Sequence, residues 1–374
     1  MSANEFLVLG AGMMGRAIAF DLVQSRGKDS VSVIDANPQA CQALEEWLDI
    51  DVHNLDAGNK EIDRLISDSK SVICALPYGF NLQFMRKAIA AGAHFCDLGG
   101  NDDIVRGQLA LDQEAKDSDV LCLPDCGLAP GMANVLGAHL TNQFDNVEEL
   151  TIRVGGLPQN PKPPLNYQLV FSVGGLINEY KEKCKVLRDG QITEVDPMIE
   201  VEELEFPEIG KLEAFTTSGG AAWLPEIFQG RVQNLDYKTI RYPGHAVIFE
   251  SILKLGLADE EEIAPGITPR NVLERQIVKN LSGDDKDMVL VRASASGQID
   301  GDQITKTMDI VDYYDQQNDI SAMMRTTAYP TSIIAQMVVD GKIPDRGVRT
   351  PEMVVPGELF LKELAARDII VKEY

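Results

Sequence analysis

A glycine-rich turn near the N-terminus carries the clearest chemical signal in the sequence. Residues 10–15 read Gly-Ala-Gly-Met-Met-Gly and follow an apolar run, residues 6–9. In a dinucleotide site the first glycine permits a tight turn, the second lets a pyrophosphate approach the backbone, and the third lets a helix pack on the strand. The start of that helix directs N–H groups at the anion. We therefore predict that a dinucleotide is bound by Gly10, Gly12, Met13, Met14 and Gly15.

The next apolar run indicates which dinucleotide. It spans residues 31–34 and ends in Asp35, 20 residues after Gly15. An acidic side chain at this point accepts hydrogen bonds from the adenosine ribose hydroxyls and repels a 2′-phosphate, so it favours NAD over NADP. Arg26 and Lys28 are the nearby cations that would reverse this preference. The alternative interpretation is a packing turn with Asp35 as an ordinary helix cap.

Three more residues are predicted to line the cofactor site. Asp56 ends a segment, residues 51–56, that suits a short third strand and the loop that closes over adenine. Leu76 and Pro77 end a buried strand that begins near residue 71. The carboxyl ends of parallel strands form the ligand crevice of an open α/β sheet, so these residues belong at its rim.

Acid–base chemistry points to the same rim. Asp97 and Asp125 each follow an apolar run, and Tyr78 follows Pro77, so all three should ring one cleft. Carboxylates there bind the ammonium groups of a substrate or orient a base. Each of them would otherwise cap the loop that follows it, an alternative that fits Asp125 better than Asp97. Tyr78 contacts the cofactor or substrate, or packs as a plain aromatic residue.

A second group of candidates lies in the motif of residues 241–245. His245 stands at a predicted helix start, and its ordinary pKa of about 6.5 suits a proton shuttle. A capping or core histidine is the alternative. Arg241 offers the fork that binds a substrate carboxylate, with Arg153 as its competitor. Tyr242 is predicted to contact the substrate.

Three remaining candidates have weaker signals. We treat Cys126 as a wall of the cleft, because no histidine is near it in sequence to activate it as a nucleophile. Thr217, in the polar turn of residues 216–220, is predicted to hydrogen-bond the substrate, with Trp223 as an apolar lid. An ordinary glycine turn explains this segment equally well.

Two kinds of element must position these residues. Strand and helix signals alternate through the first third of the chain, which predicts a doubly wound parallel sheet of the Rossmann type. Beyond residue 131 the signals become those of an α+β domain with a mostly antiparallel sheet. Its expected strands are residues 149–154, 168–171, 184–187, 191–195, 211–216 and 237–242, followed by a hairpin of residues 288–295 and 304–313.

The expected domains follow from this change. Residues 1–130 are predicted to form the dinucleotide-binding domain and residues 131–320 a substrate and dimerisation domain. Helices over residues 323–339 and 358–366 lie in a third segment, residues 321–374, that is expected to return to the first domain.

Composition excludes several functions. The 374 residues are 44% hydrophobic, enough for two cores, and their net charge of −24 disfavours nucleic-acid or anionic membrane partners. No long apolar run or leader pattern is visible, so we expect a cytoplasmic protein. Six scattered cysteines without a C-x-x-C pair suit reduced core thiols, and four histidines without metal-ligand spacing predict no metal site.

Four motifs together carry a family resemblance. They are Cys-Asp-Leu-Gly-Gly-Asn at 96–101, Asp-Cys-Gly-Leu-Ala-Pro-Gly-Met-Ala-Asn at 125–134, Gly-Gly-Leu-Pro at 155–158 and Arg-Tyr-Pro-Gly-His at 241–245. With residues 347–363, they resemble the saccharopine dehydrogenase superfamily, and within it the lysine 6-dehydrogenases. The resemblance implies a Rossmann domain joined to a second domain, NAD(P)-dependent chemistry on the amine of lysine or a lysine derivative, and a homodimer built through the second domain.

One departure from the family pattern narrows the substrate. The glutamate-forming saccharopine reductases have an Asp that helps hold the substrate where this chain has Ala129. Together with Asp35, this favours NAD-dependent oxidation of the lysine ε-amine to 2-aminoadipate 6-semialdehyde, with release of ammonia and cyclisation to piperideine-6-carboxylate. The alternatives are a saccharopine or carboxynorspermidine dehydrogenase, and an NAD-binding sensor without catalysis.

Overall fold

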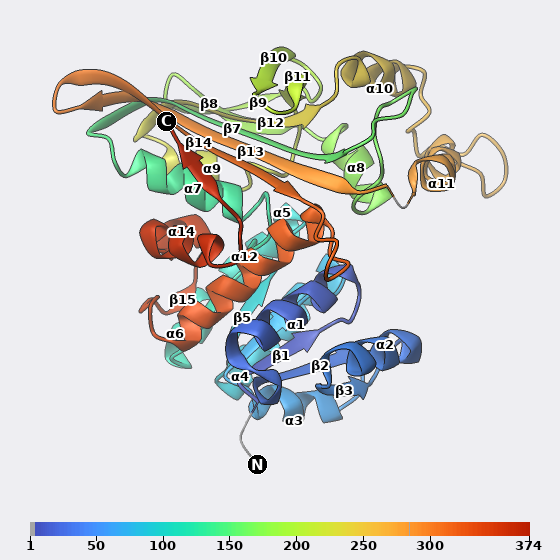
Figure 1. The fold of residues 1–374 in the computed structure, drawn as a ribbon, viewed down its shortest axis with the longest axis vertical. Coiled ribbons are helices and arrows are strands. Elements are labelled where there is room, and N and C mark those ends of the chain that lie inside the picture. Colours follow the sequence, from blue (N-terminus) through green and yellow to red (C-terminus); the bar gives the residue numbers. More distant parts are fainter. Residues whose placement is uncertain (1–3, 284) are drawn as a thin grey trace. The chain divides into compact units, whose positions relative to one another are not determined.

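The structure, a computed structural model, describes residues 4–283 and 285–374 and divides into two compact units (Figure 1). Unit 1 contains the residues up to His139 together with Met324–Ile369, and unit 2 contains Leu140–Met323 together with Ile370–Tyr374. Each unit is therefore built from two separate stretches of the chain.

Unit 1 is organised around a parallel sheet. In the described part of the chain this sheet has seven strands in the order β15-β6-β5-β4-β1-β2-β3, all parallel. The order reverses between β1 and β4, which is the switch point of a doubly wound sheet. The predicted fold class is thus confirmed. The strands are β1 (Phe6–Leu9), β2 (Val31–Asp35), β3 (Asp51–Asn54), β4 (Ser71–Cys74), β5 (His94–Asp97), β6 (Leu121–Leu123) and β15 (Gly347–Val348).

Helices surround this sheet because its central strands are apolar on both faces. Buried Asp21 in α1 accepts hydrogen bonds from Ser332 Oγ and Arg367 Nε, both at 2.6 Å, so the C-terminal segment is anchored to the first helix. The helices that lie wholly or mostly in this unit are α1 (Met13–Arg26), α2 (Pro38–Leu48), α3 (Glu61–Ser67), α4 (Asn81–Ala91), α5 (Asp102–Leu109), α6 (Asp112–Asp117), α7 (Met132–Thr141), α12 (Ala322–Val339), α13 (Pro351–Val354) and α14 (Gly357–Ala365).

Unit 2 contains a mixed sheet that is mostly antiparallel. Its strands follow the order β10-β11-β12-β7-β13-β14-β16, with β8 paired to β12 and β9 paired to β8. Among the described strands of this sheet, only β7 and β12 pair in parallel. The strands are β7 (Asn146–Pro158), β8 (Cys184–Arg188), β9 (Gln191–Val195), β10 (Glu202–Phe206), β11 (Gly210–Thr216), β12 (Val232–Arg241), β13 (Asp287–Ile299), β14 (Asp302–Tyr313) and β16 (Val371–Glu373).

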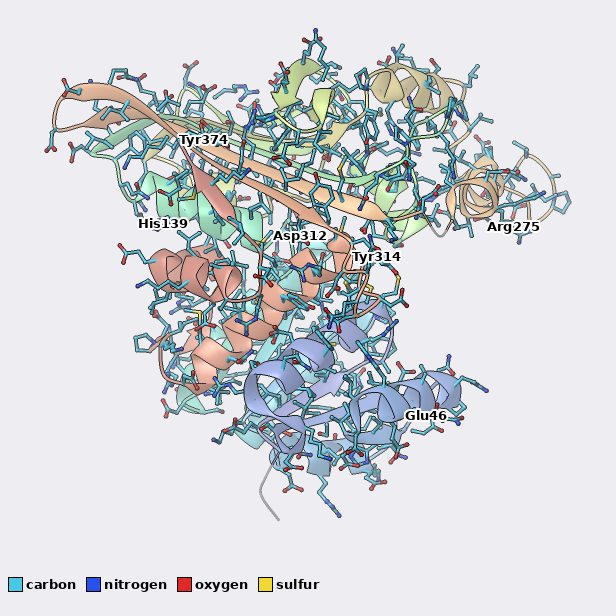
Figure 2. All side chains as sticks on the ribbon, viewed as in Figure 1. Glu46, His139, Arg275, Asp312, Tyr314 and Tyr374 are labelled. Atoms are coloured by element: carbon cyan, nitrogen blue, oxygen red, sulfur yellow. The ribbon has the colours of Figure 1, made fainter. Side chains whose placement is uncertain are left out.

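Most of the predicted elements of unit 2 are present. The hairpin β13–β14 pairs from Met288 with Tyr313 to Ile299 with Asp302, as predicted. Tyr374, labelled in Figure 2, donates its N–H to the Thr307 carbonyl (3.0 Å) and continues the pairing of β16. The helices are α8 (Val173–Glu179), α9 (Leu224–Phe228), α10 (His245–Lys254) and α11 (Pro269–Leu281).

Two local predictions are wrong. Residues 168–171 form no strand, because Leu169 donates its N–H to the Leu281 carbonyl (2.8 Å) and the Gln168 amide donates to the Gly283 carbonyl (2.9 Å). The segment therefore packs as a loop on the end of α11. The first helix, predicted to begin near Arg16, begins three residues earlier at Met13.

No helix within the described ranges has both the length and the apolar character needed to cross a bilayer. All six cysteines are buried free thiols.

Candidate functional site

The glycine turn has the geometry that a dinucleotide site requires. Gly10 has a φ of +106°, which favours glycine, and a Cβ on Gly15 would overlap the Gly10 carbonyl oxygen. A Cβ on Gly12 would meet open space, so the approach to this backbone is clear. The first hydrogen bond within α1 runs from the Arg16 N–H to the Gly12 carbonyl (2.8 Å), and helix geometry leaves the preceding N–H groups for a ligand.

Asp35 is held firmly against this turn. Its Oδ2 accepts the Ala11 N–H (2.6 Å) and its Oδ1 accepts the Asn37 N–H (2.7 Å). A carboxylate has about four acceptor positions, so both oxygens keep capacity for ribose hydroxyls. The structure therefore brings Asp35 to the glycine turn, as the sequence predicted.

The two cations that would favour a 2′-phosphate are engaged elsewhere. Arg26, at the end of α1, makes an ion pair with Asp340 (2.7 Å) and donates to Gln336 Oε1 (2.9 Å). Lys28 makes an ion pair with Asp49. Neither side chain counterbalances the negative charge of Asp35 at the predicted ribose site.

The other predicted cofactor residues are placed as follows. Met13 is exposed and Met14 half-buried in the first turn of α1, and Leu76 packs beside Gly10. Pro77 precedes a short 3₁₀ turn, Tyr78–Phe80. Asp56 is exposed in a separate turn, where its Oδ1 accepts the Gly58 N–H (3.0 Å).

The adjacent strands β5 and β6 bring Asp97 and Asp125 together. Asp97 Oδ1 accepts the N–H groups of Gly99 (2.8 Å) and Asp125 (3.3 Å), while its Oδ2 accepts the Gln108 side-chain amide (2.6 Å). Burial raises the pKa of Asp97 to about 6. Asp97 therefore holds the loop that follows β5.

Asp125 differs from Asp97 because its carboxylate receives no hydrogen bond from any residue in the described ranges. Asp125 is 3% exposed, has a φ of +62° and lies against Gly99, which leaves no space for a Cβ there. Burial raises its pKa well above the usual range, and Asp97 and Glu352 raise it further. The prediction that Asp125 fits the loop-capping role better than Asp97 is wrong, since Asp97 is the cap.

Sequence reasoning missed Glu352 at this sheet edge. It lies in α13, directly after β15, which pairs with β6. Its side chain is buried, its Oε1 has no hydrogen-bond partner, and burial raises its pKa to about 7. Glu352 lies within residues 347–363, a segment that contributes to the family resemblance, but nothing in that segment marks this carboxylate as part of the site.

Cys126 and Tyr78 complete this group. Cys126 is fully buried and its Sγ lies 3.3 Å from the Leu123 carbonyl oxygen. Burial raises the pKa of the thiol well above the usual range, which fits a wall of the cleft and disfavours a thiolate nucleophile. Tyr78 is 47% exposed, and its ring packs against Gly100.

In unit 2 a chain of hydrogen bonds links Arg241 to His245. Arg241 Nε donates to Tyr180 Oη (2.8 Å), and Tyr180 Oη lies 3.2 Å from His245 Nε2. His245 Nδ1 lies 3.0 Å from the Leu165 carbonyl oxygen and must be the protonated ring nitrogen, because a carbonyl only accepts. Nε2 then accepts the Tyr180 hydroxyl proton.

This arrangement removes the chemical basis for His245 as a proton shuttle. The ring is buried and stacks near Phe215 and Phe249 at the start of α10. Burial, and next the charge of Arg241, lower the pKa of His245 to about 3. The expectation of an unperturbed pKa is therefore wrong, and the imidazole is neutral at physiological pH with both nitrogens in use.

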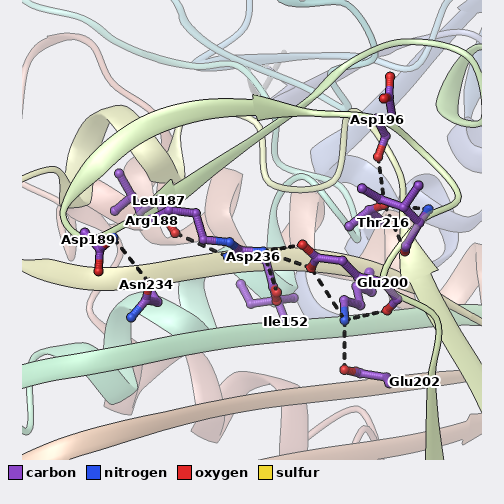
Figure 3. A network of polar contacts seen from close by, with 12 residues as sticks. Ile152, Leu187, Arg188, Asp189, Asp196, Glu200, Glu202, Thr216, Asn234 and Asp236 are labelled. Carbon is purple, nitrogen blue, oxygen red and sulfur yellow. Dashed lines mark hydrogen bonds and ion pairs between the residues drawn. The ribbon is translucent and has the colours of Figure 1, made fainter.

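The structure distinguishes Arg241 from Arg153, the other arginine that the sequence offered for binding a substrate carboxylate. Arg153 makes ion pairs with Asp236 (2.6 Å) and Glu202, and Lys238 also binds Glu202 (2.9 Å). Figure 3 shows Asp236, Glu200 and Glu202 converging in this network. Arg241 is 2% exposed, and no carboxylate of the described residues lies within ion-pair distance of it.

Three other predicted substrate contacts have partners within unit 2. The Thr217 hydroxyl lies 2.7 Å from that of Thr239, and the Tyr242 hydroxyl donates to the Pro158 carbonyl (3.0 Å). Tyr242 follows Arg241 in the strand direction and packs with a different apolar cluster. Trp223 is half-buried, with Lys185 Nζ 5.3 Å from its ring centroid. Thr239, the partner of Thr217, lies on the same face of β12 as Arg241.

Sequence reasoning also missed Glu179, the last residue of α8. Burial raises the pKa of its carboxyl to about 7, and Arg241 opposes this shift. Its carboxylate receives no hydrogen bond from the described residues. The preceding sequence carries no recognisable motif, so only the three-dimensional structure places Glu179 near Arg241.

A glycine turn of this geometry on a doubly wound sheet places the chain in the class of dinucleotide-binding α/β proteins. Comparison with protein families is more specific. Residues 6–123 match the saccharopine dehydrogenase NADP binding domain, and residues 127–370 match the saccharopine dehydrogenase C-terminal domain. The chain belongs to the saccharopine dehydrogenase family, and its cofactor is a nicotinamide dinucleotide.

Curated relatives are distant. The mitochondrial alpha-aminoadipic semialdehyde synthase of Rattus norvegicus is 21% identical over 93% of this chain, which spans only 45% of that protein. Saccharopine dehydrogenase [NADP(+), L-glutamate-forming] of Saccharomyces cerevisiae is 20% identical over 96% of both chains. Carboxyaminopropylagmatine dehydrogenase of Synechocystis is 22% identical and covers 96% of this chain and 94% of its own.

A solved structure shares the fold. Saccharopine dehydrogenase (L-Glu forming) from Saccharomyces cerevisiae superposes with a TM-score of 0.83 at 18% sequence identity and covers 99% of both chains. At this identity the likeness establishes the fold alone.

Proposed function

We propose that this chain is an NAD-dependent dehydrogenase that oxidises the side-chain amine of L-lysine. The product is 2-aminoadipate 6-semialdehyde, formed with release of ammonia, which cyclises to piperideine-6-carboxylate. The observation that carries the proposal is the buried Asp125 carboxylate, which has no donor among the described residues and lies at the carboxyl edge of the nucleotide-binding sheet. An ammonium group is the partner that such a carboxylate lacks.

The chemistry requires a group that handles protons. The nicotinamide, when bound, accepts a hydride, and the substrate can release one only from a neutral amine. Lysine arrives as an ammonium, so a base must accept its proton, and a base must also assist the addition of water to the imine. Asp125 has a pKa raised well above the usual range by burial, which suits this role better than the low pKa of His245. Asp97 Oδ1 accepts the backbone N–H of Asp125 and so holds Asp125 in position.

Two features support NAD as the cofactor. The Asp35 carboxylate is fixed at the turn by Ala11 and Asn37, and its charge repels a 2′-phosphate. Arg26 and Lys28 are each in an ion pair with another carboxylate. The native protein should have a larger kcat/KM with NAD than with NADP. We expect Asp35→Ser to reduce this preference by about 10-fold or more, which corresponds to about 1.4 kcal/mol.

A second candidate function is saccharopine or carboxynorspermidine oxidation. The names of the yeast and Synechocystis relatives favour it. Ala129 weighs against saccharopine, because it cannot supply the polar contact that the saccharopine reductases make at this position.

A substrate panel tests these proposals. Purified protein with NAD or NADP is given L-lysine, saccharopine or carboxynorspermidine, and NAD(P)H absorbance and free ammonia are measured. We expect NADH and ammonia in equal amounts with lysine, and Asp125→Asn should lose about 100-fold or more in kcat. Turnover of saccharopine with glutamate release and no ammonia would contradict the proposal. Tight NAD binding without any turnover would instead support the sensor.

We also propose a homodimer formed through unit 2. Exposed apolar side chains on α10 and in the segment leading to α11 support it, including Val247, Leu255 and Ile263, which are 63%, 76% and 71% exposed. Light scattering should give twice the chain mass for the native protein and a monomer for Leu255→Glu. A monomeric native protein would refute the dimer.

A further inference from the structure

The two aspartates at the edge of the parallel sheet differ in the hydrogen bonds that they receive. Asp97 Oδ1 accepts the backbone N–H groups of Gly99 (2.8 Å) and Asp125 (3.3 Å), and its Oδ2 accepts the Gln108 side-chain amide (2.6 Å). The Asp125 carboxyl receives no hydrogen bond from the described residues. All the N–H donors of this pair therefore point at Asp97.

The two carboxyl groups share one buried site. Both contact Gly99, whose N–H binds Asp97 and on which a Cβ would lie 2.0 Å from Asp125 Oδ1. Asp97 is 0% exposed and Asp125 3%, and no cation of the described residues forms an ion pair with either of them. Two carboxylates in such a site repel each other, so one of them keeps a proton at neutral pH.

The other titratable groups at this edge supply no positive charge. They come from β4, β6, α5 and α13 and from the loop after β6, and they are the thiols of Cys74, Cys122 and Cys126 and the carboxyls of Asp102 and Glu352. Burial raises the pKa of each of these thiols, so they are neutral at physiological pH. Hydrogen-bond donors, and not a cation, must decide which aspartate is charged.

Gln108 is the side-chain donor in this arrangement. It lies in α5 and is 0% exposed, and its Oε1 has no hydrogen-bond partner among the described residues. A buried carbonyl oxygen without a partner is unfavourable and needs an explanation. The need to direct the Gln108 amide nitrogen at Asp97 supplies one. A hydrogen bond donated to a carboxylate favours its charged form, so the amide acts on the ionisation of Asp97.

The ionisation of the two residues agrees with this geometry. Burial raises the pKa of Asp97 to about 6, and the hydrogen bonds from Gln108, Gly99 and Asp125 oppose the rise. Burial raises the pKa of Asp125 well above the usual range, and the charge of Asp97 raises it further.

We propose that Gln108 is a positioning residue whose amide keeps the negative charge of the aspartate pair on Asp97 and so leaves the proton on Asp125. This inference rests on the proposed function, because Asp125 is the proposed base. It goes beyond that function by assigning a role to a residue outside every sequence motif. A substrate ammonium beside Asp125 favours the charged carboxylate, so binding releases this proton to solvent and leaves the base ready.

The test follows the protonated carboxyl groups by infrared spectroscopy as a function of pH, in the protein without substrate. The bands are assigned by their loss in Asp97→Asn and in Asp125→Asn. In the native protein the Asp97 band should disappear with a midpoint near pH 6, while the Asp125 band persists to higher pH. Gln108→Met removes the donor and should raise the Asp97 midpoint by about one pH unit or more.

A matched control and a kinetic measurement accompany this titration. Gln113→Met removes an exposed amide that donates to Asp117 (2.8 Å), and it should leave both midpoints unchanged. In Gln108→Met the acid limb of kcat/KM for lysine should move to higher pH by the same amount as the Asp97 midpoint. The reason is that a neutral aspartate pair does not attract the substrate ammonium.

Two results would overturn the inference. One is an unchanged Asp97 midpoint in Gln108→Met, since a merely structural role lowers the melting temperature without moving the titration. The other is an unchanged Asp125 midpoint in Asp97→Asn, where the loss of the neighbouring charge should let Asp125 ionise at lower pH. If Gln108→Met does not fold, Gln108→Asn takes its place, because its shorter amide does not reach Asp97.

The infrared titration needs no substrate, so its result is independent of turnover. If lysine is not oxidised but the Asp97 midpoint depends on Gln108, the proposed function fails and the role of Gln108 in the aspartate pair stands.

Discussion

Strand β12 carries two clusters of charge on its opposite faces, and they are built in opposite ways. On one face, Asp236 and Lys238 join Arg153 and the acidic residues of the neighbouring segment in a network where each charge has a partner (Figure 3). On the other face, Arg241 meets only neutral acceptors. Alternate residues of a strand point to opposite faces. Asp236 and Arg241 are therefore only five positions apart but belong to two clusters, one with counterions and one without.

We propose that this difference distinguishes a structural charge from one that binds a ligand. Burial alone does not distinguish them, since Arg153 and Arg241 are 6% and 2% exposed. The presence of a counterion does. Removing one member of a compensated network leaves its partner buried without a counterion and destabilises the fold. A buried charge without a counterion can instead form an ion pair with a bound ligand.

The largest expected effect is on the compensated cluster. Arg153→Met should lower the free energy of unfolding by about 3–5 kcal/mol, because buried Asp236 keeps only its longer ion pair with Arg188 (3.5 Å) and Glu202 loses one of its two cations. Chemical denaturation measures this loss. The KM for the amino-acid substrate should stay within about 2-fold of the native value in the folded fraction. Lys211→Met, which removes an exposed ion pair with Glu203, is the control and should leave stability unchanged.

Arg241→Met should instead reduce activity strongly and stability only slightly. We expect kcat/KM for lysine to fall by about 100-fold or more, since a buried fork that binds a carboxylate is lost. The free energy of unfolding should fall far less than in Arg153→Met, because no carboxylate loses its partner. Steady-state kinetics together with denaturation test the pair of variants. Similar stability losses in both would remove the distinction between the clusters.

His245 gives the uncompensated cluster a characteristic pH dependence. Its pKa is about 3 in the folded protein, whereas the unfolded chain takes up a proton below about pH 6.5. Unfolding therefore binds a proton in this window, and stability falls as the pH is lowered from about 6.5 towards 3. Native protein should show a slope about 1.4 kcal/mol per pH unit steeper than His245→Asn in urea unfolding between about pH 4 and pH 6. Parallel slopes would mean that the folded imidazole is protonated.

The smallest expected effect concerns the hydroxyl that joins Arg241 to His245. Tyr180→Phe leaves His245 Nε2 buried without a donor, so the free energy of unfolding should fall by about 1–3 kcal/mol. The guanidinium also loses its anchor, and KM should rise by a few-fold while kcat changes less. Tyr242→Phe also loses one hydroxyl hydrogen bond, to Pro158, and should lower stability without raising KM. An equal rise in KM for both variants would contradict this role of Tyr180.

Local features of the site were predictable from the sequence. The positions of Gly10, Gly12 and Gly15 follow from a six-residue motif whose geometry depends on its own backbone. The same holds for Asp35 at the end of β2. The doubly wound sheet was also predictable, because apolar strand patterns and helix patterns alternate along the first third of the chain.

Properties that depend on distant neighbours were not predictable. The sequence placed Asp97 and Asp125 at one sheet edge, but which of them caps the loop depends on the left-handed backbone of Asp125. The sequence also placed His245 at a helix start, but its pKa depends on Phe215 and Phe249 around it. Glu179 has no motif, and only tertiary packing brings it to the Arg241 cluster.

The two-residue strand β15 has a consequence for how the protein is made. It pairs with β6, although more than 200 residues separate them along the chain. During synthesis the edge of β6 emerges early and stays without its neighbour until the ribosome has produced Leu140–Met323, the main stretch of unit 2. An unpaired edge strand is a template for pairing with other chains, so this interval is when the nascent protein most needs a chaperone.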